Sequence, residues 1–490
     1  MASISPNQSS QPVYRRIADR LRGEIQDGRL VPGGRLPTIR GLAAELGVHR
    51  DTVALAYDEL ARAGLVESTV GRGTFVCEAS PPPVARELLL APTVDRLLEF
   101  GRARPHYPAG TDAVPLHALV PDPSLYPVAE FRRSLNRVLA RGGEELLRYG
   151  GAQGHPGLRG VLAARFCAPS AAVDAEEIIV TQGASEGISL ALRLFAEAGD
   201  TVAVEEPTYH NVLAAIVALR LRPVPVPMRA GAPDLVALER TLERPEVKLF
   251  YTMPTFHNPL GTSTGLAHRR ALLGVAARTG KPVVEDAYEM DLRYAGRPLP
   301  SLASLDASGL VVQLFSFSKS LFPGARVGCL SARGRAVDGL LALKHATDLG
   351  GALVLQAALA DFVASGGYDR HLGRLRRTLL GRRDAMLEAL AREMPEGVRW
   401  TEPEGGHQIW VELPIALDTR DLLPEAARAG VLFAPGYQFH HDGRASSGLR
   451  LSIAVADEAA IRRGVEALAR VVRERMQETR ASSRAANVHV

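Results

Sequence analysis

One lysine in this sequence follows a strand-like run and is flanked by small hydroxyl side chains. Lys319 closes the segment Ser316-Phe317-Ser318-Lys319, which comes directly after the apolar run Val311–Phe315. An amine held against apolar walls loses the solvation of its ammonium form, so its pKa falls and the free amine becomes a nucleophile. Such an amine could form an imine with an aldehyde cofactor, and the two serines together with Arg326 could hold that cofactor's phosphate. The alternative is a polar turn that carries an exposed lysine.

The scarcity of lysine favours the first interpretation. The basic side chains are mostly arginine, and lysine occurs only at Lys248, Lys281, Lys319 and Lys344. A lysine in a hydroxyl-rich turn after a strand is therefore less easily explained as an ordinary exposed lysine without a function.

Length and composition indicate a soluble, globular protein of two or three domains. The chain has 490 residues, of which 46% are hydrophobic and 23% charged, so it can bury large cores. No run approaches the roughly 18–20 apolar residues that span a membrane, and the N-terminus lacks the basic and apolar regions of a signal peptide. Cys77, Cys167 and Cys329 lie far apart, which excludes a disulfide framework and fits a reducing cytoplasm. The net charge of +4 neither requires nor forbids a local basic face for nucleic acid.

The stretch 12–77 predicts three short helices followed by a hairpin. Apolar residues at every fourth position from Val13 predict the first helix, and Thr38 can cap the second. The third helix begins near His49, and residues 66–76 form two short strands around a glycine turn. This is the pattern of a winged helix-turn-helix domain, whose third helix fits the major groove of DNA.

Polar side chains of this domain lie where phosphates or base edges would be met. They are found at the second helix, at the start of the third helix and at the hairpin turn: Thr38, Arg40, His49, Arg50, Thr52, Arg72 and Gly73. Residues 12–76 contain ten Arg against eight Asp plus Glu, a net charge of only +2. Binding to DNA must therefore depend on the positions of individual side chains and on dimerisation rather than on the net charge of the domain. The alternative is a helical protein-interaction module with ordinary surface arginines.

The N-terminal motifs resemble the GntR family of bacterial regulators. They are Leu36-Pro37-Thr38-Ile39-Arg40-Gly41-Leu42-Ala43, Leu46-Gly47-Val48-His49-Arg50-Asp51-Thr52-Val53 and Gly71-Arg72-Gly73-Thr74-Phe75-Val76. The resemblance implies DNA contact through the residues that match Arg40, Arg50, Thr52 and the wing turn. His49 differs from the serine or threonine usual at its position, and histidine is a weaker helix cap.

The rest of the chain predicts an α/β fold, a mostly parallel sheet flanked by helices. Residues 1–11 are expected to be disordered, and 78–112 form a proline-stiffened linker with one short helix near 94–100. Residues 113–352 form a large lobe, 353–475 a small C-terminal α/β lobe, and 476–490 a loose tail. The candidate strands are Ile178–Thr181, Thr201–Glu205, Val224–Val226, Leu249–Thr252, Pro282–Asp286, Val311–Phe315 and Arg326–Leu330. Ligands of such sheets bind at the carboxyl ends of the strands.

Three of these strand ends carry residues suited to a phosphorylated ring. Gly183-Ala184-Ser185 opens a helix, whose free N–H groups and positive dipole end suit a phosphate. Tyr209 could stack on a flat ring, and the Asn258 amide could reach a ring hydroxyl. Taken singly, each has an ordinary alternative: a glycine turn, a core tyrosine and an Asn-Pro turn.

The fifth strand ends in Glu285-Asp286-Ala287-Tyr288. A carboxylate buried at Asp286 would keep a pyridine nitrogen protonated, which makes the ring an electron sink. Tyr288 could donate to a phenolic oxygen. A buried aspartate after an apolar strand is rarely without a partner.

These features together resemble the fold-type I, aspartate-aminotransferase-like proteins that use pyridoxal 5'-phosphate. The resemblance runs from about Val114 to Val472 and includes Asn258-Pro259, Asp286-Ala287-Tyr288, Ser316–Lys319 and Gly448-Leu449-Arg450-Leu451-Ser452. It implies that Lys319 carries the imine, Asp286 pairs with the pyridine nitrogen, Asn258 and Tyr288 hold the phenolic oxygen and Tyr209 stacks on the ring. It assigns the phosphate to Gly183, Ala184, Ser185, Ser316, Ser318 and Arg326, with Tyr149 contributed by the other subunit, and the carboxylate of an amino acid to Arg450. Ser185 differs from the glutamine frequent at its position.

A GntR domain joined by a linker to an aminotransferase-like domain is the arrangement of the MocR/GabR group of bacterial regulators. The resemblance implies a pyridoxal-phosphate-dependent transcription factor that binds promoter DNA, senses an amine, an amino acid or the cofactor itself, and forms a head-to-tail, domain-swapped homodimer. An active aminotransferase that retains a DNA-binding domain is the alternative, and a cofactor-binding scaffold without DNA is a third.

Two further groups of residues are expected to be surface features. The arginines between Arg374 and Arg383 lie on a long polar helix, for which a solvated face is the simplest interpretation. His440 and His441 are adjacent and do not share a face of a regular strand or helix, so no metal site is expected there.

Overall fold

The computed structural model describes residues 12–69, 72–77, 88–107, 112–166, 173–414 and 417–487, with side chains described up to residue 479. The chain divides into two compact units, Met1–Leu89 and Leu90–Val490. In the described part of the chain, no helix combines the length and the apolar character that a membrane crossing requires.

The N-terminal unit has the three helices and the hairpin predicted from its sequence. The elements are α1 (Val13–Gln26), α2 (Ile39–Leu46), α3 (Arg50–Arg62), β1 (Val66–Thr69) and β2 (Gly73–Val76). Ile17 and Leu21 of α1 are buried in one core with Val53 and Leu60 of α3. Val13, predicted to share this face, is 45% exposed because the helix begins there and the core covers only the following turns. The strands β1 and β2 are antiparallel, and the tip of their turn at residues 70–71 lies outside the described residues.

The second unit is built around an eight-stranded sheet of order β4-β11-β10-β9-β8-β5-β6-β7. The strands are β4 (Ile178–Thr181), β5 (Thr201–Glu206), β6 (Arg222–Arg229), β7 (Ala232–Pro233), β8 (Val247–Thr252), β9 (Val283–Asp286), β10 (Val311–Ser316) and β11 (Gly328–Ser331). The run from β10 to β6 is parallel, whereas β11 and β7 are antiparallel to their neighbours. Each strand predicted from the sequence coincides with one of these strands, with small differences at the ends.

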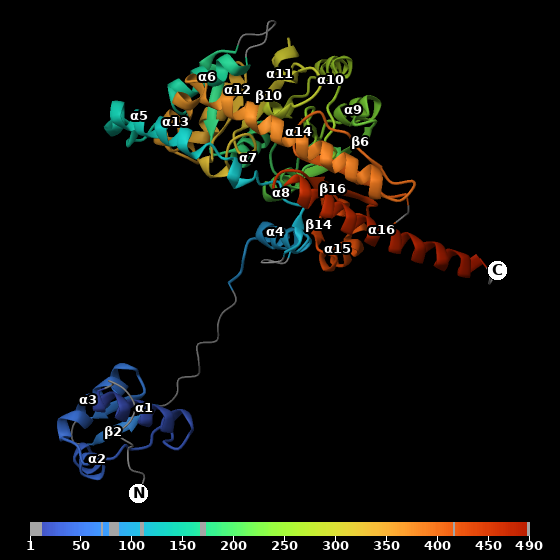
Figure 1. Cartoon of the computed structure of the whole chain (residues 1–490). Helices are drawn as coiled ribbons and strands as arrows, with labels where there is room; N and C mark the ends of the chain where they lie inside the picture. Colours follow the sequence, from blue (N-terminus) through green and yellow to red (C-terminus); the bar gives the residue numbers. More distant parts are fainter. Residues whose placement is uncertain are drawn as a thin grey trace. The chain divides into compact units, whose positions relative to one another are not determined.

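Helices cover both faces of this sheet because consecutive strand residues point to opposite sides. Val284 and Val312 pack in one apolar cluster with residues of α7 and α8, whereas Val283 and Val311 pack in another with residues of α9 and α10. Both faces are therefore buried, as is usual for parallel strands. The helices of this region are α5 (Val128–Leu146), α6 (Pro156–Phe166), α7 (Ala184–Phe195), α8 (His210–Ala218), α9 (Leu235–Leu242), α10 (Leu266–Thr279), α11 (Leu302–Leu305), α12 (Arg335–His345) and α13 (Leu353–Ala364) (Figure 1).

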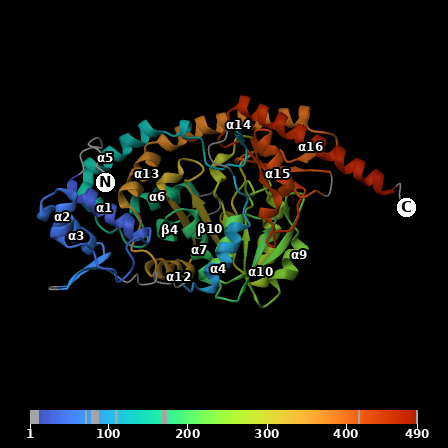
Figure 2. The same cartoon turned by 90° about the horizontal axis from the view of Figure 1, so that it is seen from below.

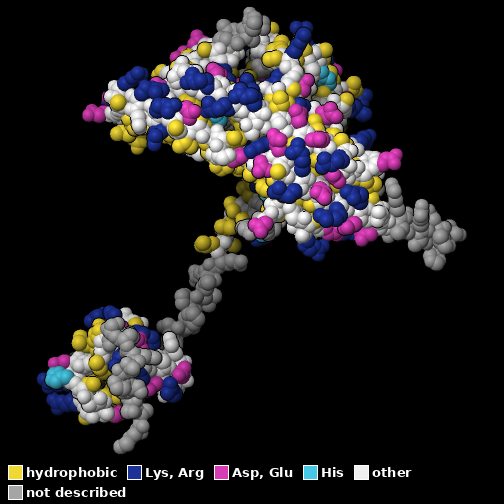
Figure 3. Space-filling view, viewed as in Figure 1, with side chains coloured by type: hydrophobic (Ala, Val, Ile, Leu, Met, Phe, Trp, Pro, Cys, Tyr) yellow, Lys and Arg dark blue, Asp and Glu magenta, His cyan; other side chains and the backbone are white. Residues whose placement is uncertain are grey.

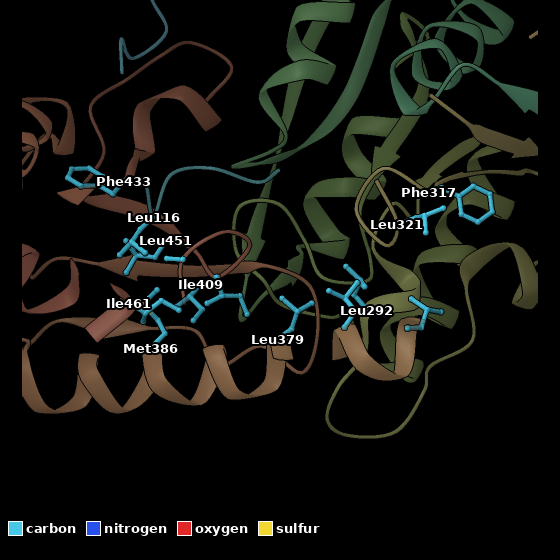
Figure 4. Close-up of a cluster of buried hydrophobic side chains, with 14 of the residues drawn as sticks. Leu116, Leu292, Phe317, Leu321, Leu379, Met386, Ile409, Phe433, Leu451 and Ile461 are labelled. Atoms are coloured by element: carbon cyan, nitrogen blue, oxygen red, sulfur yellow. The ribbon is translucent and has the colours of Figure 1, made fainter. Parts of the chain in front are cut away.

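A four-stranded sheet of order β12-β13-β16-β15 forms the C-terminal part of the unit. Its strands are β12 (Arg399–Trp400), β13 (Gln408–Glu412), β15 (Ala434–Pro435) and β16 (Gly448–Ser452), and the helices around it are α14 (Gly367–Glu393), α15 (Thr419–Arg428) and α16 (Glu458–Asn487). The helices α14 and α16 lie side by side in both cartoon views (Figures 1 and 2). Leu379 and Met386 of α14 pack toward Ile409, Leu451 and Ile461 (Figure 4).

The predicted loose tail from residue 476 is wrong for residues 476–487, which continue α16. Met476 is only 4% exposed, and Arg475 forms an ion pair with Glu425 of α15. The buried Met476 and the ion pair of Arg475 thus hold the helix in place where the polar stretch of the sequence begins. The alanine, arginine and glutamate residues that follow have high helix propensity and favour continuation of the helix.

The predicted linker 78–112 is too long, because the second unit begins at Leu90. The expected short helix is α4 (Pro92–Arg102), which packs against α8 and places Phe100 against the apolar cluster below it. After it, β3 (Val114–Pro115) pairs in parallel with β14 (Val431–Leu432). The segment that leaves the linker therefore joins the large sheet's helices to the C-terminal part.

The face of the second unit crossed by α14 carries charges of both signs. Figure 3 shows dark blue Lys and Arg side chains interspersed with magenta Asp and Glu side chains over this face. Arg374 forms an ion pair with Glu130, and Arg382 forms one with Asp122. The prediction that these arginines form a solvated face holds for Arg374, whereas Arg382 is buried and ties α14 to the segment before α5.

Candidate functional site

One cavity of about 470 Å³ is lined by residues from the strand ends that the sequence predicts. Of the predicted residues, its walls include Ala184, Ser185, Tyr209, Asn258, Asp286, Tyr288, Ser316, Ser318, Lys319, Arg326 and Arg450. Gly183 directly precedes them at the start of α7. The spatial grouping expected from the parallel sheet is therefore present.

Lys319 is held in the cavity wall by its immediate neighbours. Phe317 and Leu321, two residues away on either side, are 0% and 1% exposed and are anchored in the core shown in Figure 4. The Lys319 Nζ donates a hydrogen bond to the Leu119 carbonyl oxygen at 2.7 Å. Burial lowers the pKa of this amine to about 8, against the raising effect of the nearby Glu289. About a tenth of the amine is therefore unprotonated at pH 7 and can act as a nucleophile.

Asp286 ends β9 and is almost completely buried, at 1% exposure. Its Oδ2 accepts a hydrogen bond from the Tyr251 hydroxyl at 2.6 Å, and its Oδ1 accepts one from the backbone N–H of Tyr288 at 3.2 Å. Burial raises the pKa of this carboxyl to about 7, although both hydrogen bonds favour the charged form. A cationic partner in the cavity would draw the group to its carboxylate form.

The start of α7 and Arg326 form a cradle suited to a phosphate. Gly183 has φ +89°, and a Cβ built on it would lie 3.2 Å from the Arg326 guanidinium, so a larger residue would crowd that arginine. Arg326 itself donates to the Gln182 carbonyl oxygen at 3.0 Å, and Ser316 and Ser318 share a hydrogen bond of 3.1 Å between their hydroxyls. Free N–H groups, hydroxyls and a guanidinium are the donors by which proteins hold phosphates.

Arg450 is a buried guanidinium that binds only neutral groups among the described residues. It lies on β16 and is 4% exposed. Its Nη1 donates to Asn258 Oδ1 at 3.1 Å and its Nη2 donates to the His117 carbonyl oxygen at 2.7 Å, while its Nε has no partner. Burial lowers its pKa from the ordinary value. A buried cation that no carboxylate neutralises is costly, and an anionic ligand would remove that cost.

A buried hydrogen-bonded chain behind Tyr288 was not predicted from the sequence. Gln408 Nε2 donates to the Tyr288 hydroxyl at 2.9 Å and to Glu289 Oε2 at 3.1 Å. The other oxygen of Glu289 lies 2.6 Å from His407 Nδ1. Tyr288 Oη also donates to the Phe256 carbonyl oxygen at 3.1 Å. The chain fixes the tyrosine hydroxyl at the cavity wall.

The two units match two protein families. Residues 13–76 match the bacterial regulatory proteins of the gntR family, and residues 121–468 match aminotransferase class I and II. Over 469 residues the chain is 31% identical to the probable rhizopine catabolism regulatory protein MocR of Rhizobium meliloti, and the match covers 93% of each chain. The chain belongs to the MocR-type regulators. The family, the N-terminal helix-turn-helix domain and the regulatory function predicted from the sequence are confirmed.

The second unit of this MocR-type regulator has the fold of solved aminotransferases. The multiple substrate aminotransferase of Thermococcus profundus is 32% identical with a TM-score of 0.72, covering 80% of this chain and 97% of that one. LysN, the α-aminoadipate aminotransferase of Thermus thermophilus, complexed with N-(5'-phosphopyridoxyl)-L-leucine, is 33% identical with a TM-score of 0.69, covering 78% and 95%. These likenesses confirm the predicted fold-type I domain.

The regulator's N-terminal unit presents most of its predicted DNA-contacting residues to solvent. Arg40, Arg50 and Arg72 are exposed, and Thr52 is half-buried at the first turn of α3. The expected cap at Thr38 is present, since its Oγ1 accepts from the Gly41 N–H at 3.1 Å. His49 caps α3 through a longer contact of 3.4 Å from the Asp51 N–H to its Nδ1.

The wing of the regulator needs glycine at position 73. Gly73 has φ +115°, and a Cβ built there would lie 2.7 Å from the Arg35 guanidinium. The backbone conformation therefore strongly favours glycine, and a larger side chain would also displace the end of the Arg35 side chain.

Two predicted cofactor residues, Gly183 and Tyr149, are not among the cavity walls, and only Gly183 directly adjoins a wall residue in the chain. The Tyr149 side chain is 87% exposed on the segment after α5. The assignment of Tyr149 to the other subunit's site stays a prediction.

The two adjacent histidines of the C-terminal part contact the same carboxylate, contrary to the geometric expectation. His440 Nδ1 lies 2.6 Å and His441 Nδ1 lies 3.3 Å from the oxygens of Glu206. They follow a short 3-10 turn, η5 (Gly436–Phe439), so the rule for regular elements does not apply. Glu206, His441 and Asp442 offer atoms within 4.8 Å of one another that could hold a metal ion, but Arg444 Nη2 already lies 3.0 Å from Glu206.

Proposed function

We propose that this regulator binds promoter DNA through its N-terminal unit, holds pyridoxal 5'-phosphate at Lys319, and senses a primary amine or amino acid in the same cavity. The observation that carries the proposal is the amine of Lys319, with its pKa lowered to about 8, in one cavity with Asp286, Arg326 and Arg450. When bound, the cofactor supplies an aldehyde that condenses with primary amines and a pyridine ring that is an electron sink when protonated.

The chemical types of the cavity residues support this cofactor. Asp286 would hold the ring nitrogen, Asn258 and Tyr288 the phenolic oxygen, and Tyr209 the ring face. The phosphate would lie against Gly183, Ala184, Ser185, Ser316, Ser318 and Arg326, with Tyr149 of a second subunit as a further donor. The cradle that a Cβ at Gly183 would crowd supports the phosphate assignment most directly.

The environment of Arg450 favours amino acids rather than simple amines as the ligands that the protein senses. Its guanidinium is buried and has no carboxylate partner among the described residues. A planar guanidinium binds a carboxylate through two parallel hydrogen bonds. The α-carboxylate of an amino acid whose amine approaches the cofactor would satisfy it.

Two hydrogen bonds from the cavity hold one short backbone segment of the second unit. The Lys319 Nζ donates to the Leu119 carbonyl oxygen and Arg450 Nη2 donates to the His117 carbonyl oxygen, both at 2.7 Å. Cofactor attachment would engage the first donor and an effector carboxylate the second. We therefore propose that occupancy loosens residues 117–119 of the second unit, and that this change shifts the population of DNA-binding states.

The second unit carries apolar side chains that suit a homodimer. Val120, Val128, Leu147 and Tyr149 are 51%, 67%, 75% and 87% exposed. Burial of such side chains between two copies would be favourable, and two DNA-binding units on one dimer would suit paired half-sites. We propose the head-to-tail, domain-swapped arrangement expected from the sequence.

An active aminotransferase is the second candidate, favoured by the complete set of cavity residues. Protein loaded with the cofactor and incubated with amino acids separates the two. A stable change of the cofactor absorbance without keto acid supports a sensor. Keto acid in stoichiometric or larger amount supports turnover.

Replacement of Arg50 by alanine is expected to weaken binding to a promoter fragment. Arg50 is exposed at the first position of α3, and loss of a phosphate or base contact there should cost roughly tenfold in affinity or more. Fluorescence anisotropy at fixed salt measures the effect. Arg62→Ala, at the other end of the same helix, is the matched control and should bind like the native protein. Equal affinities for both variants would contradict the assignment of α3 as the recognition helix.

Replacement of Arg450 by alanine is expected to weaken the response to amino acids selectively. Loss of a charge-assisted pair costs about 1.5–3 kcal/mol, so the affinity for L-alanine should fall roughly tenfold to hundredfold. Ethylamine lacks the carboxylate and should bind the native protein and the variant with more similar affinities. Titration of the cofactor absorbance measures both ligands. A native protein that responds equally to L-alanine and ethylamine would refute the carboxylate role.

A further inference from the structure

Three guanidinium groups line the candidate site, and two of them are accounted for by the proposed function. Arg326 belongs to the phosphate cradle and Arg450 to the α-carboxylate. Arg104 is the third, and Asp286 is the single carboxylate in the described walls of the cavity. Arg104 therefore adds a positive charge that neither the cofactor nor an α-amino acid group uses.

Arg104 reaches the cavity from the segment that follows α4. Tyr437 donates to the Ala103 carbonyl oxygen at 2.9 Å, and Tyr107 donates to the Phe433 carbonyl oxygen at 3.1 Å. These bonds fasten the backbone on both sides of Arg104 to the C-terminal part of the unit. These two hydrogen bonds therefore fix the backbone that places Arg104 at the cavity wall.

The Arg104 guanidinium has no carboxylate partner among the described residues. Its Nη2 donates to Asn211 Oδ1 at 3.2 Å, and its carbon lies 5.3 Å from the centre of the Phe100 ring. The remaining donors of the planar group are available to a ligand. Its side chain is exposed, as expected for a group at the mouth of the cavity rather than at its floor.

Arg104 and Arg450 both approach the start of α8. The carbon of the Arg450 guanidinium lies 5.1 Å from the centre of the Phe439 ring, and that ring centre lies 6.1 Å from the centre of the His210 ring. Arg104 contacts Asn211, the residue after His210. Burial lowers the pKa of His210 to about 3, and Arg450 and then Arg104 lower it further in the same direction. His210 is therefore neutral and cannot supply the positive charge of this region. Both cations therefore line the cavity near the start of α8 and can bind two anionic groups of one ligand.

We infer that the amino acid sensed by this regulator carries a second acidic group, which Arg104 binds while Arg450 binds the α-carboxylate. The inference deepens the proposed function and rests on it for the α-amino acid. The chemical class is a dicarboxylic amino acid, because a guanidinium recognises a carboxylate through a fork of N–H donors.

The competing explanation is that Arg104 only supports Tyr209. Arg104 donates to Asn211 Oδ1, and Asn211 Nδ2 in turn lies 2.6 Å from the Tyr209 hydroxyl. Arg104→Gln keeps an amide donor for Asn211 and removes the charge. Arg104→Lys keeps the charge and removes the planar fork. The two variants therefore separate a supporting role from a binding role.

Titration of cofactor-loaded protein with L-glutamate, L-2-aminoadipate and L-glutamine tests the inference. In the native protein at least one of the two acidic ligands should bind about tenfold more tightly than glutamine, as expected for one charge-assisted contact. In Arg104→Gln the acidic-to-neutral ratio should fall to about one, and in Arg104→Lys it should remain above one. A native ratio of one for both acids, or a native ratio that persists in Arg104→Gln, would overturn the inference.

Calorimetry with glutarate separates this inference from the proposed cofactor chemistry. Glutarate has two carboxylates and no amine, so its binding needs no reaction at the cofactor. It should bind the native protein about tenfold more tightly than it binds Arg104→Gln, and butyrate should show no such difference. Equal binding of glutarate to both proteins refutes the acidic subsite. Failure of every amino acid to change the absorbance, with glutarate still discriminating, refutes the proposed function alone.

Discussion

Replacement of Lys319 by alanine will abolish covalent capture of pyridoxal phosphate and leave the fold in place. Lys319 is the single amine in the described walls of the cavity. Its turn is held by the buried Phe317 and Leu321, which the substitution does not touch. The lost hydrogen bond to Leu119 is offset because the amine no longer has to be desolvated.

Borohydride reduction followed by peptide mass spectrometry measures this effect. The native protein should yield the reduced adduct on the peptide that contains Lys319, and the variant should yield none. Lys248→Ala is the control. The Lys248 Nζ lies 3.6 Å from Asp200 Oδ1, and Lys248 is not among the cavity walls, so its replacement should leave the adduct intact. An adduct that forms equally well in Lys319→Ala would place the chemistry on another amine.

The pH dependence of adduct formation follows from the same amine. The pKa of Lys319 is lowered from 10.5 to about 8, and only the unprotonated amine attacks an aldehyde. Between pH 6 and about 8 the rate of capture should therefore rise roughly tenfold per pH unit and then level off. A rate that keeps rising to pH 10 would indicate an ordinary exposed lysine.

The sequence predicts the local parts of the site well because their signals are local. An apolar run followed by a polar residue marks a strand end, so Asp286 and Lys319 can both be placed from the sequence alone. The parallel order of β8, β9 and β10 then brings their ends together.

Contacts between distant segments could not be predicted. The bond between Lys319 and Leu119 joins residues 200 positions apart, and the pair of His407 and Glu289 spans 118 positions. No single-sequence pattern encodes such distances. Arg104 falls in the predicted linker for the same reason, since only the packing of α4 on α8 shows that this segment belongs to the second unit.

Replacement of Asp286 by asparagine is expected to change cofactor affinity and apo-protein stability in opposite directions. Asparagine keeps one oxygen that can accept from the Tyr288 N–H, and its amide NH2 can donate to the Tyr251 hydroxyl oxygen. It loses the charge that would pair with a protonated ring nitrogen. Breaking a buried charge pair costs about 3–5 kcal/mol, so cofactor affinity should fall roughly hundredfold or more. Titration of absorbance with pyridoxal phosphate measures this loss.

The stability effect in the cofactor-free protein has a defined pH window. The pKa of Asp286 is raised by burial from 3.8 to about 7, so between these values the folded state holds a proton that the unfolded state has released. The contribution of this group to stability is thus fully present below about pH 4 and is lost as the pH rises toward and through 7. The asparagine side chain does not titrate, so the advantage of Asp286→Asn over the native apo-protein should grow from pH 4 to 7 and remain above it. Thermal unfolding across this range measures the difference, and a variant that is less stable than the native apo-protein at pH 8 would show that the buried carboxylate is compensated by its neighbours without any cofactor.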